Sequence, residues 1–441
     1  MNPPDSSRQF ARLTYEAIFA RAVGLLGGFA ANIMIARSLG AGGKGLLTTL
    51  AVWSGLLASL FSVGIHLATV YELGARPWHA RRLYSFVLPY VSGATLLLGS
   101  VYFLFRNRIG HPELPLLFLV LLFSAQLLCN LAFALLIGLR NQSAVNWLQV
   151  AGAVCYPALV GVILVLRNSL DVAMVALCMV VMPVMSALFA LILLKKKTIP
   201  QVPAGPMALQ WAGFLRYALK STAMATGSLL YSQIVMLIIS AGGNPAQVGV
   251  FSVAMIFMDT ATVIPAMIAS FVLPRWAGLP NSEVLIRACR VIRLTHPISL
   301  VIAVGAAFLA MVLAGPVFGK DFSGVGMLAL IMVPGAWAAT GITVISYSFL
   351  SQNRHVIPLS LAWLGTLLSG GLAWWCLPKF GCAGAAMAVT LSRLIVLLWA
   401  WASFARANRE APRPMWIPGR QDVQAWGQIV RHSLIWIRCR T

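Results

Sequence analysis

The feature of this chain that most limits its fold is a series of long apolar blocks. Twelve of them follow one another, each about 20 to 27 residues long, with short polar gaps between them. A helix of that length crosses the hydrocarbon core of a bilayer, which is about 30 Å thick. We therefore expect an all-α integral membrane protein with about twelve transmembrane helices, over approximately residues 14–36, 45–71, 84–105, 114–138, 146–166, 171–194, 214–240, 247–273, 295–318, 324–350, 357–378 and 381–404.

The composition supports a membrane protein over a soluble one. Apolar residues fill 60% of the 441 positions, charged residues fill only 10%, and the mean hydropathy is +0.87. A water-soluble domain of this size needs more polar surface than that.

The net charge of +22 is distributed as a topology signal. If the N-terminus is cytoplasmic, 23 Lys and Arg residues fall in inner segments and only seven in outer turns. Because positive residues concentrate in cytoplasmic loops, both termini are expected in the cytoplasm. The same charge matches anionic inner-membrane lipids, and nucleic acid is not an expected partner.

The sequence shows no motif of an enzyme or of a cofactor site. Gly43-Lys44 lacks the spacing of a Walker loop, which would need a glycine in place of Ser38 and a Ser or Thr in place of Gly45. The seven cysteines have no metal-ligand spacing and are interpreted as small apolar fillers. The chain is therefore not expected to be an enzyme, and no cofactor or metal is expected.

The blocks divide six and six around the longest polar gap near the middle. We expect an N-terminal six-helix bundle over 1–194, a cytoplasmic linker over 195–213 and a C-terminal six-helix bundle over 214–404. The stretch 33–53 resembles 235–257 at an offset of about 202 to 204 residues, since both read as helix, Gly-rich turn and helix. This predicts an internal repeat whose halves are related by an axis along the membrane normal.

Two further segments carry amphipathic patterns. The stretch 274–297 predicts a short cytoplasmic helix that leads into the ninth block. The basic tail, 405–441, fits either an interfacial helix on the inner leaflet or a disordered segment.

Few ionisable residues lie inside the blocks, so each is a candidate for function. Arg21 shares a face of the first block with Gly24, Gly28 and Asn32. That face fits a cavity wall, whereas an Arg21 that snorkels to the inner headgroups is the alternative. Arg37 is expected to end this block at the outer interface, and a gating role there is a further hypothesis. The glycines after it predict a tight turn between two helices: Gly40, Gly42, Gly43 and Gly45.

The seventh block carries a second set of polar residues. Lys220 opens a helix whose polar half includes Gln233, and Arg216 lies one turn earlier. Lys220 is either an inner-leaflet anchor or a cation that faces Arg21 across a cleft. On the second interpretation an inward-open cationic cavity is expected, with Arg21 and Lys220 in its wall and Arg216 nearer its mouth.

The remaining candidates concern coupling. His66 lies on a stripe of small and hydroxyl residues in the second block, where a histidine is either hydrogen-bonded packing or a proton carrier. Asp259 is the acid well inside the eighth block, one to two turns before Pro265, which permits a kink. It is a candidate proton or sodium site, and the alternative is a structural partner for a neighbouring arginine such as Arg393.

The stretch "NIMIARSLGAGGKG" resembles the first-helix signature of polysaccharide-export flippases, and "VGVFSVAMIFMD" followed by "FVLPRWA" resembles their helix 8. Helix 8 of these flippases usually carries an aromatic residue directly after its Val-Gly pair. This chain departs from that pattern, because Phe251 follows Val250 and so comes one residue later. The chain thus resembles Wzx-like oligosaccharide flippases of the multidrug/oligosaccharidyl-lipid/polysaccharide (MOP) exporter superfamily. The resemblance implies a MATE-like fold, two six-helix bundles around a cleft that opens alternately to each side, and a polyprenyl-diphosphate-linked glycan as substrate.

Three functions are therefore compared. The leading one is a flippase that moves a polyprenyl-diphosphate-linked oligosaccharide to the outer leaflet, with proton or sodium coupling as a hypothesis. The second is a multidrug antiporter of the same fold, which would be expected to carry more acids in its core. The third is a membrane glycosyltransferase or polymerase, which would need catalytic acids in a large outer loop.

Overall fold

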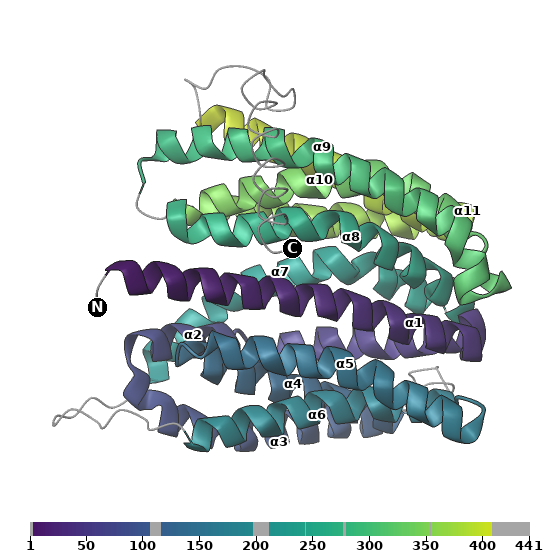
Figure 1. Ribbon diagram of the computed structural model, residues 1–441, viewed down its shortest axis with the longest axis horizontal. Coiled ribbons are helices and arrows are strands. Elements are labelled where there is room, and N and C mark those ends of the chain that lie inside the picture. The colour runs from purple at the N-terminus through teal and green to yellow at the C-terminus, as the bar shows by residue number, and fades with distance from the viewer. Residues whose placement is uncertain are drawn as a thin grey trace, which may run out of the picture. The chain divides into compact units, whose positions relative to one another are not determined.

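The computed structural model describes residues 3–105, 116–196, 211–242, 244–276, 279–352 and 354–407. These residues are almost entirely helical (Figure 1). The α-helices are α1 (Pro3–Ser62), α2 (Ile65–Ala75), α3 (Ala80–Phe105), α4 (Leu116–Gly138), α5 (Gln142–Arg167), α6 (Val172–Lys196), α7 (Trp211–Ala241), α8 (Pro245–Trp276), α9 (Asn281–Leu313), α10 (Val325–Ser351) and α11 (Val356–Ala407). Three short helical turns complete the set: Pro77–His79, Ala314–Phe318 and Lys320–Phe322.

The number of membrane spans agrees with the prediction. Among the described residues, ten helical stretches are long and apolar enough to cross a bilayer. Two of them, in α1 and α11, are each divided by a non-helical glycine into two segments of spanning length. The chain is therefore a multi-pass membrane protein, and the predicted all-α fold with about twelve spans is confirmed.

The breaks inside α1 and α11 follow from backbone geometry. Gly40 has φ 67° and Gly381 has φ 56°, a left-handed region that glycine enters without the steric cost of a Cβ. Of the four glycines predicted to form a turn after Arg37, only Gly40 takes a positive φ, and helix resumes directly after it. The expected loop is a sharp kink.

A second break divides the block predicted over 45–71. Val63 and Gly64 both have positive φ, 42° and 63°, and they separate α1 from α2. A β-branched residue is strained in this region, so other contacts must hold Val63 there.

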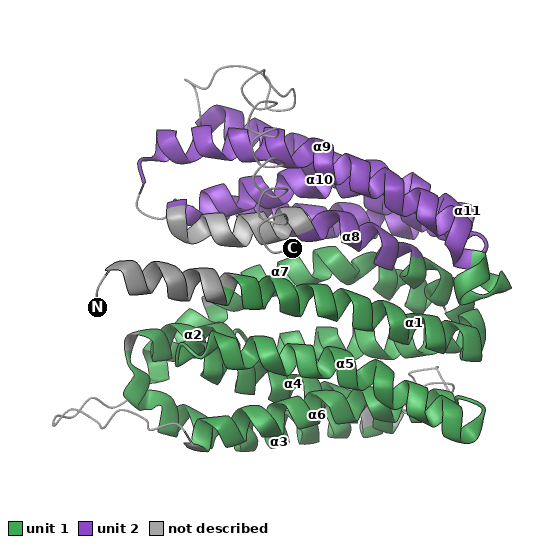
Figure 2. Cartoon of the chain, viewed as in Figure 1, with its two compact units in different colours: residues 1–253, 315–322 green, residues 254–314, 323–441 purple. Residues whose placement is uncertain are grey.

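The chain forms two compact units, shown in Figure 2: residues 1–253 with 315–322, and residues 254–314 with 323–441. The first unit includes α7 and the beginning of α8, so packing does not group the helices six and six. The predicted bundles at 1–194 and 214–404 stay a prediction, because units that pack together need not coincide with units that were duplicated.

The first unit is built around α4. Phe123, Leu127, Leu131 and Leu135 lie four residues apart along one ridge of α4 and are at most 1% exposed. This ridge belongs to a core to which α1, α2, α3 and α6 also contribute. Four-residue spacing keeps side chains on one helical face, which is why an apolar block without visible amphipathicity still has a defined buried side.

In the second unit α10 packs against both α9 and α11. The α9 face includes Ala303, Ala306, Ala307 and Ala310, all at most 7% exposed, and such small side chains let helices approach closely. The helix predicted over 274–297 is not a separate element, because α9 runs without a break from Asn281 into the membrane span. The two ends of the linker predicted over 195–213 are helical instead, because α6 runs to Lys196 and α7 begins at Trp211. The rest of the linker, 197–210, and the tail beyond Ala407 lie outside the described residues.

Candidate functional site

In the first unit, α1 and the beginning of α8 cross at a very short distance. Gly45 lies against the backbone of Pro245 and Gly249, and Gly249 lies against the backbone of Ala41 and Gly45. A Cβ on either glycine would overlap the carbonyl of the other helix, so only glycine permits this approach. The two helices therefore touch backbone to backbone.

The crossing is reciprocal. Gly45 and Gly249 are 204 residues apart, and so are their contacts, Ala41 and Pro245. Thr48 and Ser252 are also 204 residues apart, and their hydroxyl oxygens are 3.5 Å from each other. Gly45 contacts Pro245, which is the equivalent of Ala41, and Gly249, which is the equivalent of Gly45, contacts Ala41. Such a reciprocal contact is two-fold symmetric. The contacts thus agree with the predicted repeat and fix its offset at this point.

Polar groups gather beside the crossing. The Lys44 ammonium donates to the Thr48 hydroxyl at 3.2 Å, and the Lys44 residue is only 8% exposed. Deeper along the same helix, the indole N–H of Trp53 donates to the Ser240 hydroxyl of α7 at 3.0 Å. Lys44 is one of the seven basic residues that the charge count assigns to outer turns, whereas the structure packs its side chain into this region.

The kink at Gly40 is held by the segment 315–322. An Asp321 carboxylate oxygen accepts from the backbone N–H of Ala41 at 3.3 Å, and the Arg37 guanidinium donates to the Pro316 carbonyl at 3.2 Å. Arg37, predicted to end the first span, thus also ties α1 to a segment almost 280 positions away. Its gating role stays a prediction.

The break between α1 and α2 is held by α3 and α7. The Tyr90 hydroxyl of α3 donates to the carbonyl of Phe61, one residue before the end of α1. Gly64 lies directly against the backbone of Ala218 and Thr222 in α7. The predicted coupling residue His66 lies just beyond this break, with its Nδ1 3.1 Å from the Ser62 hydroxyl. This contact fits the packing alternative for His66, while a proton-carrying role stays untested.

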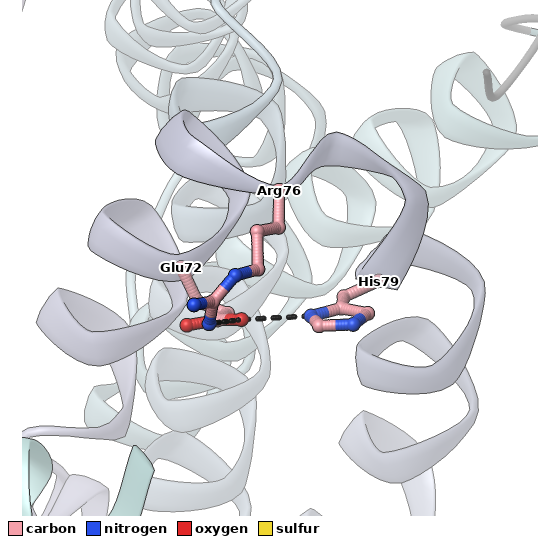
Figure 3. A network of polar contacts seen from close by, with 3 residues as sticks. All are labelled: Glu72, Arg76 and His79. Atoms are coloured by element: carbon pink, nitrogen blue, oxygen red, sulfur yellow. Dashed lines mark hydrogen bonds and ion pairs between the residues drawn. The ribbon is translucent and has the colours of Figure 1, made fainter. Parts of the chain in front are cut away.

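A largely buried polar cluster joins the end of α2 to the short helical turn Pro77–His79 that precedes α3 (Figure 3). One Glu72 carboxylate oxygen lies 2.7 Å from Nδ1 of His79 and 3.1 Å from the Arg76 guanidinium. Glu72 and His79 are 8% and 6% exposed, whereas the Arg76 side chain is half exposed. The sequence analysis missed this cluster because Glu72 falls one residue past the predicted second block.

The residues predicted to line a cationic cavity all belong to the first unit. Arg21 on α1 and Arg216 on α7 are exposed, and among the described residues neither pairs with a carboxylate. Asn32 is half-buried and donates to the Gly28 carbonyl at 2.6 Å, one turn back on the predicted face. Gln233 is half-buried on α7, and the Lys220 side chain lies outside the described part. The cavity itself stays a prediction.

The two remaining candidates belong to the second unit. Asp259 is exposed on α8, and its carbonyl accepts from the Thr262 hydroxyl at 2.8 Å. Arg393 is half-buried on α11. Their pairing stays a prediction. Within the described ranges no group of three His, Cys, Asp or Glu side chains could hold a metal ion.

No protein-family model matches the sequence, and no curated protein is significantly similar to it. The fold, in contrast, matches solved transporters. A multidrug resistance MATE family transporter of the MOP superfamily, in an inward-facing conformation, has a TM-score of 0.66 at 15% identity, over 90% of this chain and 100% of that one. A MOP superfamily transporter from Pyrococcus furiosus has a TM-score of 0.60 at 17% identity, over 90% and 95% of the two chains.

The lipid II flippase MurJ, in an inward closed conformation, has a TM-score of 0.60 at 13% identity, over 92% of this chain and 94% of that one. These three structures are transporters or flippases by their descriptions. The likeness covers nearly the whole of each chain, so the predicted MATE-like fold is confirmed.

Proposed function

We propose that this chain is an alternating-access flippase that moves a polyprenyl-diphosphate-linked oligosaccharide from the inner to the outer leaflet of a bacterial inner membrane. The observation that carries the proposal is the reciprocal crossing at Gly45 and Gly249. Transporters with internal repeats alternate access by rocking one repeat against the other. A two-fold contact between equivalent helices supplies a meeting point about which such rocking takes place.

The charge pattern supports an anionic substrate. A flippase must stabilise the negative charges of the diphosphate while they are away from bulk water, because an unpaired charge in a low-dielectric medium has a large free-energy cost. Arginine suits this role because its planar fork binds phosphate oxygens in pairs. Arg21 and Arg216 are exposed and have no carboxylate partner among the described residues, so both are available to a ligand. We assign them, with Lys220, Asn32 and Gln233, to the substrate path.

Known members of this fold also support a link between pocket charge and substrate. For the Pyrococcus furiosus transporter, a binding pocket of reverse polarity is what suggests a different function. MurJ is a flippase for lipid II. We infer that the cationic residues of this chain select a lipid-linked diphosphate in the same fold.

A multidrug or cation antiporter is the second candidate, because several of the similar structures are MATE transporters. An exporter of cations would be expected to present acids to its substrate. Glu72, the acid that the structure adds to the sequence prediction, is already engaged by His79 and Arg76. Asp259 is assigned to proton or sodium coupling, with His66, Arg393 and Arg37 as candidate coupling or gating residues.

The test uses vesicles that contain the full chain and a polyprenyl-diphosphate oligosaccharide with a fluorophore on its glycan. Dithionite added outside bleaches only the outer leaflet, so a flippase exposes the label that started inside. We expect near-complete bleaching with the wild type, and no such effect on a phosphatidylcholine with the same label. Proton- or sodium-driven efflux of an organic cation, without movement of the glycan lipid, would overturn the flippase in favour of the antiporter.

A further inference from the structure

A cavity lies in the first unit at the end where α3 begins and α4 and α6 end. Its volume is about 250 Å³, several times the ~30 Å³ that one water molecule occupies in the liquid. The space is a pocket that is open on one side, where the exposed side chains of Arg81 and Lys195 lie, rather than a closed interior void. Its size and its opening at the helix ends allow part of a lipid molecule to enter.

The lining of the cavity has two parts. Its floor is apolar and buried, and it is formed by Ala80, Leu135, Leu139 and Leu194. Its polar part consists of the Arg81, Lys195 and Tyr84 side chains. An apolar floor beneath two cations and a hydroxyl matches a molecule with a carbon backbone and an anionic end.

The two cations are available for a ligand. Arg81 lies in the first turn of α3 and Lys195 in the last turn of α6, and both are exposed. Among the described residues neither forms an ion pair with a carboxylate. The charge distribution places this end of the helices on the cytoplasmic side, where anionic lipid headgroups lie, and basic pockets between helices on that side bind such headgroups.

We propose that this cavity binds the headgroup of an anionic phospholipid of the inner leaflet. The Arg81 guanidinium and the Lys195 ammonium hold the phosphate, the Tyr84 hydroxyl donates to one of its oxygens, and the glycerol carbons lie on the apolar floor. The site is separate from the proposed substrate path, because that path lies on α1 and α7 whereas the cavity lies on α3, α4 and α6. The proposal therefore does not depend on what the protein transports.

The experiment measures thermal unfolding of the full chain in neutral detergent during titration with phosphatidylglycerol. Phosphatidylcholine and soluble glycerol phosphate are titrated in parallel. We expect phosphatidylglycerol to raise the unfolding temperature of the wild type and the two other compounds to have little effect. Charge-assisted hydrogen bonds contribute most of the selectivity, so the double variant Arg81→Ala/Lys195→Ala should need at least about ten times more phosphatidylglycerol for the same shift.

Arg82→Ala is the matched control, because Arg82 is also exposed at the start of α3 but does not line the cavity. It should respond to phosphatidylglycerol like the wild type. A second variant, Ala80→Leu, keeps both cations but fills the floor of the cavity. It should also reduce the rise in unfolding temperature with phosphatidylglycerol, and it serves as the test if the double variant does not fold. Equal stabilisation by phosphatidylcholine, by glycerol phosphate, or an equal loss in Arg82→Ala would overturn the proposal. Since no transport is measured, failure here leaves the flippase assignment intact, and the reverse also holds.

Discussion

The crossing of α1 and α8 makes a quantitative prediction about two glycines. In Gly45→Ala the new methyl group overlaps the Pro245 carbonyl, and in Gly249→Ala it overlaps the Ala41 carbonyl. Both obstacles are backbone atoms, which no rotamer change can move aside. The helices must separate to accept either substitution.

The expected cost follows from two opposing terms. Overpacking a well-packed contact destabilises by about 1–3 kcal/mol. Alanine in place of a helical glycine returns about 0.5–1 kcal/mol. Each variant should therefore lose up to about 2.5 kcal/mol of unfolding free energy, and about 1 kcal/mol when both terms take middle values. Gly42→Ala is the matched control, since nothing lies within 4 Å of its added Cβ, and it should be neutral or slightly more stable.

Two measurements test this. Denaturant unfolding in detergent gives the free energies of the single variants and of the double variant. Because both substitutions separate the same two helices, the second should cost less than the first, and the double variant should fall short of additivity by about 1 kcal/mol. A disulfide between cysteines at positions 48 and 252, whose hydroxyl oxygens are 3.5 Å apart, reports the separation directly through a lower cross-linking yield. The reasoning is refuted if Gly45→Ala unfolds and cross-links like Gly42→Ala.

Three further predictions follow from other parts of the structure. Gly64→Ala should lower the unfolding free energy by about 2–3 kcal/mol, because Gly64 combines a positive φ with contact against the α7 backbone. Gly74→Ala is the control and should not destabilise, since its added Cβ meets nothing within 4 Å; equal unfolding of the two variants would contradict the prediction. A double-mutant cycle of Glu72→Ala and His79→Ala should give a coupling of about 1–3 kcal/mol because the pair is buried, and a value below about 0.5 kcal/mol, as is usual for exposed pairs, would contradict the packing account. Asp259→Asn should abolish glycan-lipid movement in the vesicle assay at normal protein levels, and normal transport would leave only a structural role for Asp259.

The sequence predicted the membrane spans well, because the hydropathy and length of each local stretch determine whether it can cross the bilayer. The tenth block was expected over 324–350 and α10 covers Val325–Ser351. A tight turn was expected over the glycines after Arg37, because a cluster of glycines between two apolar blocks marks a turn, but the structure has only a kink at Gly40. The break at Val63 was not expected, because its cause lies in contacts from α3 and α7 rather than in its own neighbours.

Contacts between distant residues limited the prediction of the site. The repeat at 33–53 and 235–257 was visible, but the faces that meet at Gly45 and Gly249 depend on tertiary packing. Glu72 and His79 are seven residues apart, and only the geometry of the turn between them brings their side chains together. The cavity behind Arg81 arises where three helix ends meet, and no single stretch of sequence contains it.

The symmetry of the crossing separates residues that serve the fold from residues that serve a function. Where the offset of 204 pairs like with like, as at Gly45 and Gly249, packing alone explains the residue. The same offset pairs Arg21 with Ala225 and Asp259 with Gly55. If a helix in one repeat needs no charge at a position, the equivalent helix does not need one merely to fold. A lipid-linked glycan has no two-fold axis, so a path that binds it must break the symmetry of the two repeats. Arg21 and Asp259 are charges at which these repeats differ, and this gives a reason to test them that is independent of their depth in the membrane.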